Sequence, residues 1–379
     1  MPETYDYIVV GAGSAGSVIA NRLSANPEVS VCLIEAGPTD NTPLISTPLG
    51  LMLLAKNPRY NWLYQSTAQA GTAQRQIPIP RGKVLGGSSA INGMVYIRGH
   101  RADYDAWADA GCNGWSYESV LPYFKKSESN NDSTLNADWH GNNGELSVSH
   151  LRDPNPLDQV FIQAAGQLQI STCDDFNSPE PEGVGIYQVT QQAGRRHSTS
   201  AAFLEPVKKR NNLTIKTDVE ATGVEFEQQQ AIAVKVKKPD LSTHKILCRS
   251  EIVLCAGAIG SPDLLLRSGI GPADDIAAIQ VPLVKNLPGV GRNLQDHVDI
   301  LTAYHTKSHV PYGVSIRATP RLIADAFNWI FFKRGLLSSN MVEAGGFVRS
   351  TPDRQRPDIQ FHLIPVSYTH LTLPTTPYV

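Results

Sequence analysis

The sequence is poor in several features that mark large classes of protein. Its 379 residues include only five cysteines, at scattered positions and without a Cys-x-x-Cys pair, so we expect free thiols, no disulfide framework and no metal site. The formal net charge is only −2, and no dense run of lysine and arginine predicts nucleic-acid binding. No apolar run reaches the roughly 18 residues of a membrane-spanning helix, and the N-terminus lacks the basic start and apolar core of a secretion signal. We therefore expect a cytoplasmic protein.

The most informative feature that is present lies in residues 5–37. An apolar, β-branched strand runs into Gly11, Gly13 and Gly16, a helical pattern follows, and a second strand ends at Glu35. This order is typical of a dinucleotide site, because the glycines allow a tight turn and the start of the helix offers free N–H groups to phosphates. An acid at this distance accepts ribose hydroxyls, although a glycine-rich turn in an unrelated α/β unit is the alternative. The residues expected at the dinucleotide are Gly11, Gly13, Ser14, Ala15, Gly16 and Glu35.

A second glycine motif occupies residues 82–94. Gly86 and Gly87 precede two serines, Ser88 and Ser89, and allow positive φ and a close approach of the backbone to a planar or phosphate ligand. By itself this stretch is compatible with an ordinary loop. On a chain that already carries a dinucleotide motif it favours FAD over NAD, because a flavin ring must be fixed as well as the ADP half. A nicotinamide-dependent dehydrogenase, which accounts for the first motif only, is the alternative.

Several stretches together carry a family resemblance. They are Gly11–Gly37, Gly82–Asp105, Asp175–Leu213, Gly257–Gly271 and Leu287–His297. On these stretches the chain resembles the glucose–methanol–choline (GMC) oxidoreductases, a family of FAD-dependent enzymes that oxidise alcohols, and the likeness extends to near Pro365. Tyr96–Trp107 and Ser339–Ser350 are most similar to acceptor-dependent dehydrogenases of aliphatic alcohols and to choline dehydrogenases.

The resemblance implies an α/β fold with two interleaved domains. One is an FAD-binding Rossmann-like domain, expected at residues 1–147 and 190–298. The other is an α+β substrate domain built on an antiparallel sheet, expected at residues 148–189 and 299–365.

The resemblance also implies which residues meet the cofactor. The first motif would hold the ADP part, the backbone at Ala221 would meet the adenine, and Val84 with the segment from Asn92 would lie against the flavin. Some relatives tether the flavin through a histidine where this chain has Ile91, so we expect non-covalent FAD. The cofactor residues that the second motif and the resemblance add are Val84, Gly86, Gly87, Ser88, Asn92, Gly93, Met94, Val95 and Ala221.

Two acidic residues are candidates for contact with substrate. Choline-acting relatives have a glutamate two residues after a histidine that matches His297, whereas this chain has Asp299, a shorter carboxylate that favours a neutral primary alcohol. A solvated residue at the start of a strand is the alternative for Asp299. Glu343 is a second candidate, but its segment is similar in both subfamilies. We expect oxidation of a primary aliphatic alcohol to the aldehyde, with choline as the alternative substrate and a quinone as one candidate electron acceptor.

The catalytic groups of the family are not found in the sequence. The resemblance implies a histidine base and a second histidine or asparagine, in an HPxGT-like stretch and a later stretch near the C-terminus, and neither stretch occurs. His140, His297 and His362 are not convincing substitutes. Residues 366–379 match nothing expected there, and we interpret them as a non-native tail on a C-terminally truncated gene. We therefore expect this chain to be inactive and poorly soluble, and a flavin-binding protein without catalysis is the alternative.

One apolar stretch, residues 322–332, is rich in aromatic side chains. The pattern predicts a core helix. A peripheral contact with a membrane is the alternative.

Overall fold

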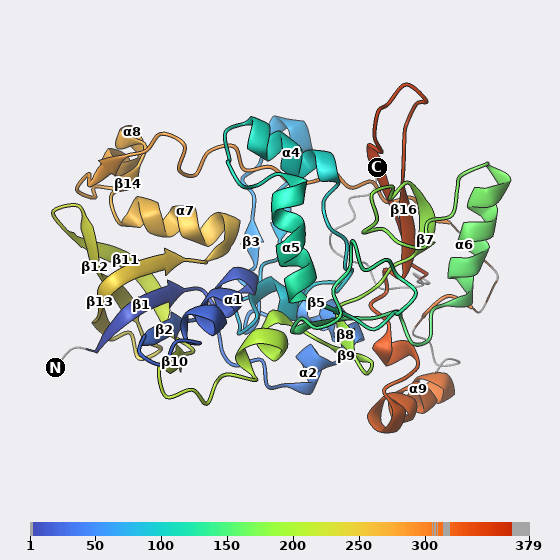
Figure 1. The fold of residues 1–379 in the computed structure, drawn as a ribbon, viewed down its shortest axis with the longest axis horizontal. Helices are drawn as coiled ribbons and strands as arrows, with labels where there is room; N and C mark the ends of the chain where they lie inside the picture. The colour runs from blue at the N-terminus through green and yellow to red at the C-terminus, as the bar shows by residue number, and fades with distance from the viewer. Residues whose placement is uncertain (1–2, 305, 307, 309, 314–318, 366–379) are drawn as a thin grey trace. The chain divides into compact units, whose positions relative to one another are not determined.

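The computed structural model describes residues 3–304, 306, 308, 310–313 and 319–365, which form two compact units (Figure 1). Unit 1 comprises the described residues up to Asn41, Leu53–Ile91 and Ser198–Thr302. Unit 2 comprises Thr42–Met52, Asn92–His197 and the described residues from Ala303 onward. The chain thus passes repeatedly between the units, and the α/β class with interleaved parts agrees with the prediction.

A six-stranded mixed sheet forms the centre of unit 1. Its strand order is β10-β2-β1-β13-β12-β11. The first four strands are parallel, and β12 and β11 are antiparallel additions at the edge. The bounds are β1 Thr4–Val10, β2 Val31–Ile34, β10 Leu213–Lys216, β11 Glu220–Glu227, β12 Gln230–Lys237 and β13 Thr243–Leu254.

The two faces of this sheet follow from the alternation of side chains along its strands. Ile8 and Val10 of β1 pack with Leu264 of α7 (Gly257–Arg267), whereas Val9 packs with Ala20 of α1 (Ser14–Leu23) on the other face. Because both faces are covered, all four residues of β2 are buried and apolar. The remaining elements of unit 1 are β3 Tyr64–Gln65, η2 Ala70–Thr72, β4 Pro78–Ile79, η3 Gly87–Ala90, η4 Ser200–Leu204, β14 Ile270–Gly271, α8 Ala273–Ala278 and β15 Lys285–Asn286.

Unit 2 is built on a smaller antiparallel sheet of order β17-β16-β7. Tyr187 is fully buried behind this sheet and donates its hydroxyl proton to the carbonyl of Phe361, with 2.6 Å between the oxygens. The strands of the sheet are β7 Gly183–Ile186, β16 Ala344–Val348 and β17 Ile359–Leu363. The other elements are α2 Pro43–Ser46, η1 Pro48–Gly50, α4 Arg101–Asp109, α5 Tyr117–Ser127, β5 Glu128–Asn130, β6 Leu146–Val148, α6 Pro156–Gln167, β8 Gln191–Gln192, β9 Arg195–Arg196, α9 Thr319–Phe332 and η6 Leu336–Ser338, and α3 Leu51–Leu54 lies at the border of the units.

The borders of the compact units differ from the predicted domain borders chiefly in residues 92–147. A buried polar network holds this segment in unit 2. Glu128 accepts a hydrogen bond from Arg98 and pairs with His140, which in turn pairs with Asp175. The assignment of one unit to the cofactor and of the other to the substrate remains a prediction.

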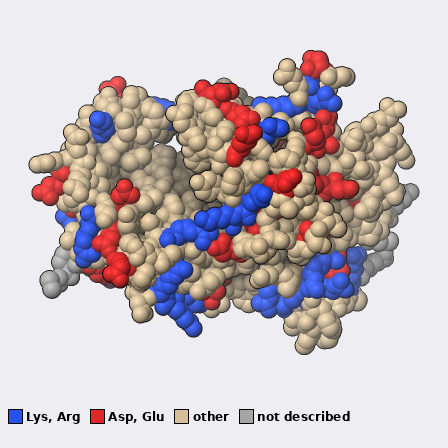
Figure 2. Space-filling model, viewed as in Figure 1, with Lys and Arg blue, Asp and Glu red and all other residues tan. Residues whose placement is uncertain are grey.

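The cysteines, the surface charges and the helices of the described residues have the following properties. Each of the five cysteines is free. On the face that Figure 2 shows, basic and acidic side chains both occur. Within the described residues, no helix has the length and apolar character needed to cross a membrane. The same residues contain no cluster of three or more histidine, cysteine or acidic side chains that could hold a metal ion.

Candidate functional site

The first glycine motif forms the turn from β1 into α1. Gly11 has φ +97°, and a Cβ there would lie 2.5 Å from the carbonyl oxygen of Cys255. A Cβ at Gly16 would lie 1.8 Å from the carbonyl oxygen of Gly11, so this glycine lets the helix pack on the turn. Gly13 occupies the N-cap of α1, where no side chain caps the helix and no acidic residue lies in the first turn. The start of α1 therefore keeps N–H groups available for an anion.

The second glycine motif lies directly against the first. The N–H of Gly86 donates to the carbonyl of Ala12 over 2.8 Å, and a Cβ at Gly87 would lie only 2.7 Å from the Cα of Gly13. Gly86 and Gly87 both have positive φ, +85° and +53°, which glycine adopts without strain. Gly13 and Gly87, which are 74 residues apart in the sequence, thus belong to one glycine-lined wall.

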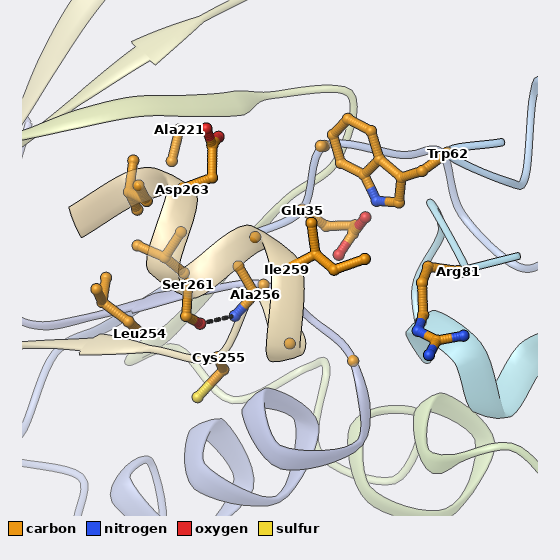
Figure 3. A pocket seen from close by; sticks show the side chains of 18 of the residues that line it. Glu35, Trp62, Arg81, Ala221, Leu254, Cys255, Ala256, Ile259, Ser261 and Asp263 are labelled. Atoms are coloured by element: carbon orange, nitrogen blue, oxygen red, sulfur yellow. Dashed lines mark hydrogen bonds between the residues drawn. The ribbon is translucent and has the colours of Figure 1, made fainter. Parts of the chain in front are cut away.

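Glu35 directly follows β2 and lies beside the first glycine motif, where Figure 3 labels it. Its side chain is 5% exposed, and its two carboxylate oxygens accept hydrogen bonds from the N–H groups of Ala12 and Gly37, each over 2.9 Å. Burial raises the pKa of Glu35 to about 7, although these backbone donors act in the opposite direction. The backbone donors fix the carboxylate at the edge of the cavity. Its remaining lone pairs can accept hydrogen bonds from hydroxyl groups there.

These parts enclose a cavity of about 740 Å³ within unit 1 (Figure 3). This volume is in the usual range for sites that bind small molecules and cofactors. The residues predicted from the sequence that line it are Gly11, Gly13, Ser14, Ala15, Glu35, Gly87, Ser88 and Ala221. Gly16, Val84 and Gly86 are not part of the lining. Val84 is fully buried, and its carbonyl accepts a hydrogen bond from the N–H of Gly87.

The structure adds lining residues that the sequence analysis missed. Trp62 and Tyr64 stack with their ring centroids 5.7 Å apart and nearly parallel, and the ammonium of Lys83 lies 4.5 Å from the Trp62 ring centre. Arg81 directly precedes the second motif and supplies a cation to the lining. Two further charged residues, Asp263 and Arg267, come from α7. The family-like stretch from Gly257 contained both α7 residues, whereas nothing local in the sequence marks Trp62 or Tyr64.

The predicted flavin segment lies in unit 2 and is held there by buried polar side chains. Arg196 donates to both the carbonyl and the side-chain oxygen of Asn92, over 2.7 and 3.0 Å. Asn340 donates its amide to the carbonyl of Gly93 over 2.6 Å. Met94 is fully buried with φ +59°, and the N–H of Thr190 donates to its carbonyl. Val95 packs more loosely, against the cluster around Tyr187.

The two substrate-side candidates have opposite surroundings. Asp299 is exposed, in a stretch without regular secondary structure. Glu343 is fully buried and accepts hydrogen bonds from the hydroxyls of Ser339 and Tyr312 and from the N–H of Asn155. Asp158 lies beside it, and burial together with the Glu343 carboxyl raises the pKa of Asp158 to about 8. The bonding of Glu343 favours a structural role at the start of α6.

The three histidines considered as candidate bases do not line the cavity of unit 1. His140 is bonded through both ring nitrogens, to Glu128 and Asp175. His297 is exposed, and the His362 ring packs edge-on against Tyr187 in the sheet of unit 2. Among the described residues, no histidine lines the cavity of unit 1.

Comparison with known proteins decides the family. A family model described as GMC oxidoreductase matches residues 5–299. The chain belongs to the GMC oxidoreductase family. Its glycine-lined cavity lies wholly within the matched part.

The curated relatives include alcohol and choline dehydrogenases. An "Alcohol dehydrogenase [acceptor]" from Pseudomonas putida is 47% identical over 362 residues, which cover 95% of this chain and 65% of that protein. A mitochondrial choline dehydrogenase from Mus musculus is 39% identical over 371 residues, which cover 96% of this chain and 61% of the relative. The chain therefore spans just under two thirds of the length of these relatives.

Solved structures agree with this family. Pyridoxine 4-oxidase from Mesorbium loti matches with a TM-score of 0.73 and 39% identity over 77% of this chain and 57% of that chain. A structure described as an FAD-dependent oxidoreductase from Chaetomium thermophilum matches with a TM-score of 0.81 and 28% identity over 90% of this chain and 61% of that chain.

Proposed function

We propose that this chain binds FAD without a covalent bond, in the manner expected of a GMC oxidoreductase. The observation that carries the proposal is the close approach of Gly87 to Gly13 in a cavity that the buried Glu35 also lines. A Cβ on Gly87 would lie 2.7 Å from the Cα of Gly13, so the two backbones approach closely only because Gly87 has no side chain. A backbone wall of this kind suits a flat or phosphate-bearing ligand. The first turn of α1 supplies N–H donors for a pyrophosphate, and Glu35 supplies an acceptor for ribose hydroxyls.

We further propose that the protein oxidises a primary aliphatic alcohol to the aldehyde. When bound, FAD would accept the hydride from the alcohol carbon. The support is the 47% identity to an acceptor-dependent alcohol dehydrogenase and the aspartate, Asp299, where we expect a glutamate in choline-acting relatives. Choline is the second candidate substrate, since choline dehydrogenases are also among the relatives. The electron acceptor is part of the same proposal, and a quinone is one candidate for it.

The test of cofactor binding is a visible-absorbance titration of the purified chain with FAD. We expect saturable binding and no comparable effect of NAD. Acid precipitation should release the yellow colour into the supernatant, because Ile91 cannot form a tether. A chain that takes up no flavin would overturn the proposal, and colour that stays in the pellet would overturn its non-covalent part.

The substrate is tested separately, by alcohol-dependent reduction of an artificial dye by the FAD-loaded product of the gene re-sequenced past Pro365, because we expect the 379-residue chain itself to be inactive. Turnover of primary aliphatic alcohols above that of choline supports the proposed substrate, and the reverse order supports choline. Flavin binding without turnover of either substrate would support the alternative of a flavin-binding protein without catalysis. That alternative draws on the surroundings of His140, His297 and His362.

A further inference from the structure

Helix α9 in unit 2 exposes an unusual amount of apolar surface. The sequence predicted a core helix here, yet Trp329 alone among its residues is buried. The side chains on its outer surface are 55% to 66% exposed. They are Ile323, Phe327, Ile330, Phe331 and Phe332.

Four of these five exposed residues form a stripe along one face of the helix, and Phe332 lies outside it. Ile323, Phe327, Ile330 and Phe331 follow each other at intervals of four, three and one, which places them on the same side of an α-helix. The rings of Phe327 and Phe331 touch, with centroids 4.5 Å apart. An outward stripe of this kind indicates a surface that meets another apolar phase.

Cationic side chains lie at both ends of this stripe. Arg321 is in the first turn of α9, and Lys333 and Arg334 directly follow the last turn. Arg152 donates to the carbonyl groups of Phe332 and Lys333, so it lies at the same end of the helix. Figure 2 shows basic atoms beside uncharged surface where Figure 1 places α9.

The carboxylates nearby do not cancel these cations. The Oδ2 of Asp325 lies 3.9 Å from the Nε of Arg321, and the Oδ1 of Asp153 lies 3.8 Å from the Nε of Arg334. Both are long ion pairs. The guanidinium-bearing side chains remain 56% and 58% exposed. The cations outnumber these carboxylates, and both arginines, held only by long ion pairs, are exposed enough to contact an anionic surface.

We propose that α9 is a docking surface for an anionic phospholipid membrane. The stripe of Ile323, Phe327, Ile330 and Phe331 would enter the boundary between headgroups and acyl chains, and the arginines would contact lipid phosphates. A helix of 14 residues is too short to cross a bilayer, so the contact is peripheral. This inference goes beyond the proposed function and does not depend on FAD.

The charges also argue against a second copy of the chain as the occupant. A two-fold interface through α9 would place the same residues of both copies against each other. Arg321 of one copy and Arg334 of the other would then meet cations across a desolvated apolar contact, which is unfavourable. A membrane with anionic lipids supplies the opposite charge instead.

The test is co-sedimentation with vesicles of phosphatidylcholine, with and without phosphatidylglycerol. We expect the chain to bind the mixed vesicles, and to bind them less at high salt because the headgroup contacts are screened. The double variant Phe327→Ser/Phe331→Ser should bind about tenfold more weakly or worse, since both rings leave the apolar phase. The double variant Arg321→Gln/Arg334→Gln should lose the preference for phosphatidylglycerol.

Leu168→Ser is the matched control, because Leu168 is 75% exposed in the same unit but lies outside α9. It should bind the vesicles as the unaltered chain does. Equal binding by the double phenylalanine variant, or no binding by the unaltered chain, would overturn the proposal. So would a self-association in sedimentation velocity that the phenylalanine substitutions abolish, since α9 would then join two copies of the chain.

Discussion

At the scale of single residues, the contact between Gly13 and Gly87 requires that Gly87 carries no side chain. Replacing Gly87 by alanine would place a Cβ 2.7 Å from the Cα of Gly13, at a φ of +53°. The positive φ alone costs about 1 kcal/mol for a residue other than glycine, and relieving the clash moves the two motifs apart. For Gly87→Ala we expect the dissociation constant for FAD to rise about tenfold or more, measured by absorbance titration.

Gly71→Ala is the control for this prediction. Gly71 is also in unit 1, but a Cβ there would have no neighbour within 4 Å. Its affinity for FAD should stay unchanged. If Gly87→Ala bound FAD as tightly as Gly71→Ala does, the contact between the motifs would not shape the site.

At the scale of the segment, Asn340 fixes the backbone of residues 92–94. Its side chain is fully buried, and its amide donates both to Gly93 and to the carbonyl of Val342. Removing a buried donor typically costs about 1–3 kcal/mol, because the carbonyl loses its partner. Asn340→Ala should therefore lower the melting temperature. If residues 92–95 meet the flavin, it should also change the visible circular dichroism of bound FAD.

Asn130→Ala separates these two effects. Asn130 is another buried amide of unit 2, but it donates to Glu128 and Gln188 and does not touch residues 92–95. It should lower the melting temperature and leave the flavin spectrum unchanged. Identical spectra for Asn340→Ala and the unaltered chain would show that the segment is not positioned by Asn340.

How far an element could be predicted from sequence depended on whether its contacts are local. The turn from Gly11 to Gly16 is local in the sequence, and Gly11, Gly13 and Glu35 do line one cavity in the structure. That these residues bind a dinucleotide stays a prediction. Trp62 reaches the same cavity from a stretch with little periodicity, and only the folded chain brings it there. Glu343 shows a related limit, because the sequence gives its charge but not the hydrogen bonds from Ser339 and Tyr312 that bury it.

At the scale of the whole molecule, the pKa shifts predict how stability depends on pH. Burial raises the pKa of Glu35 to about 7, and burial with the Glu343 carboxyl raises that of Asp158 to about 8. Burial alone would lower the pKa of His140, but its hydrogen bonds to Asp175 and Glu128 outweigh this effect and raise the pKa to about 9. In each case the folded state binds the proton more tightly than the unfolded state. The stability is therefore present at low pH and is lost as the pH rises through the folded pKa.

A carboxylate whose pKa is lower in the folded state affects stability at low pH instead. Hydrogen bonds from Thr134 and His150 lower the pKa of Asp132 to about 2, so its contribution is lost only in strong acid. The melting temperature of the flavin-free chain should therefore decrease as the pH rises from about 5 to about 9. It should also decrease when the pH is lowered into strong acid.

His140→Gln tests the part of this profile that belongs to unit 2. Glutamine is neutral, so the buried carboxylate of Glu128 and the partly buried carboxylate of Asp175 lose the positive charge of protonated His140. The variant should be less stable than the unaltered chain by about 1–3 kcal/mol at pH 6, and the difference should shrink toward pH 9 as the unaltered histidine loses its proton. Thermal unfolding at several pH values measures this. A difference that stays constant from pH 6 to pH 9 would mean that His140 contributes packing alone, with no charge in the network.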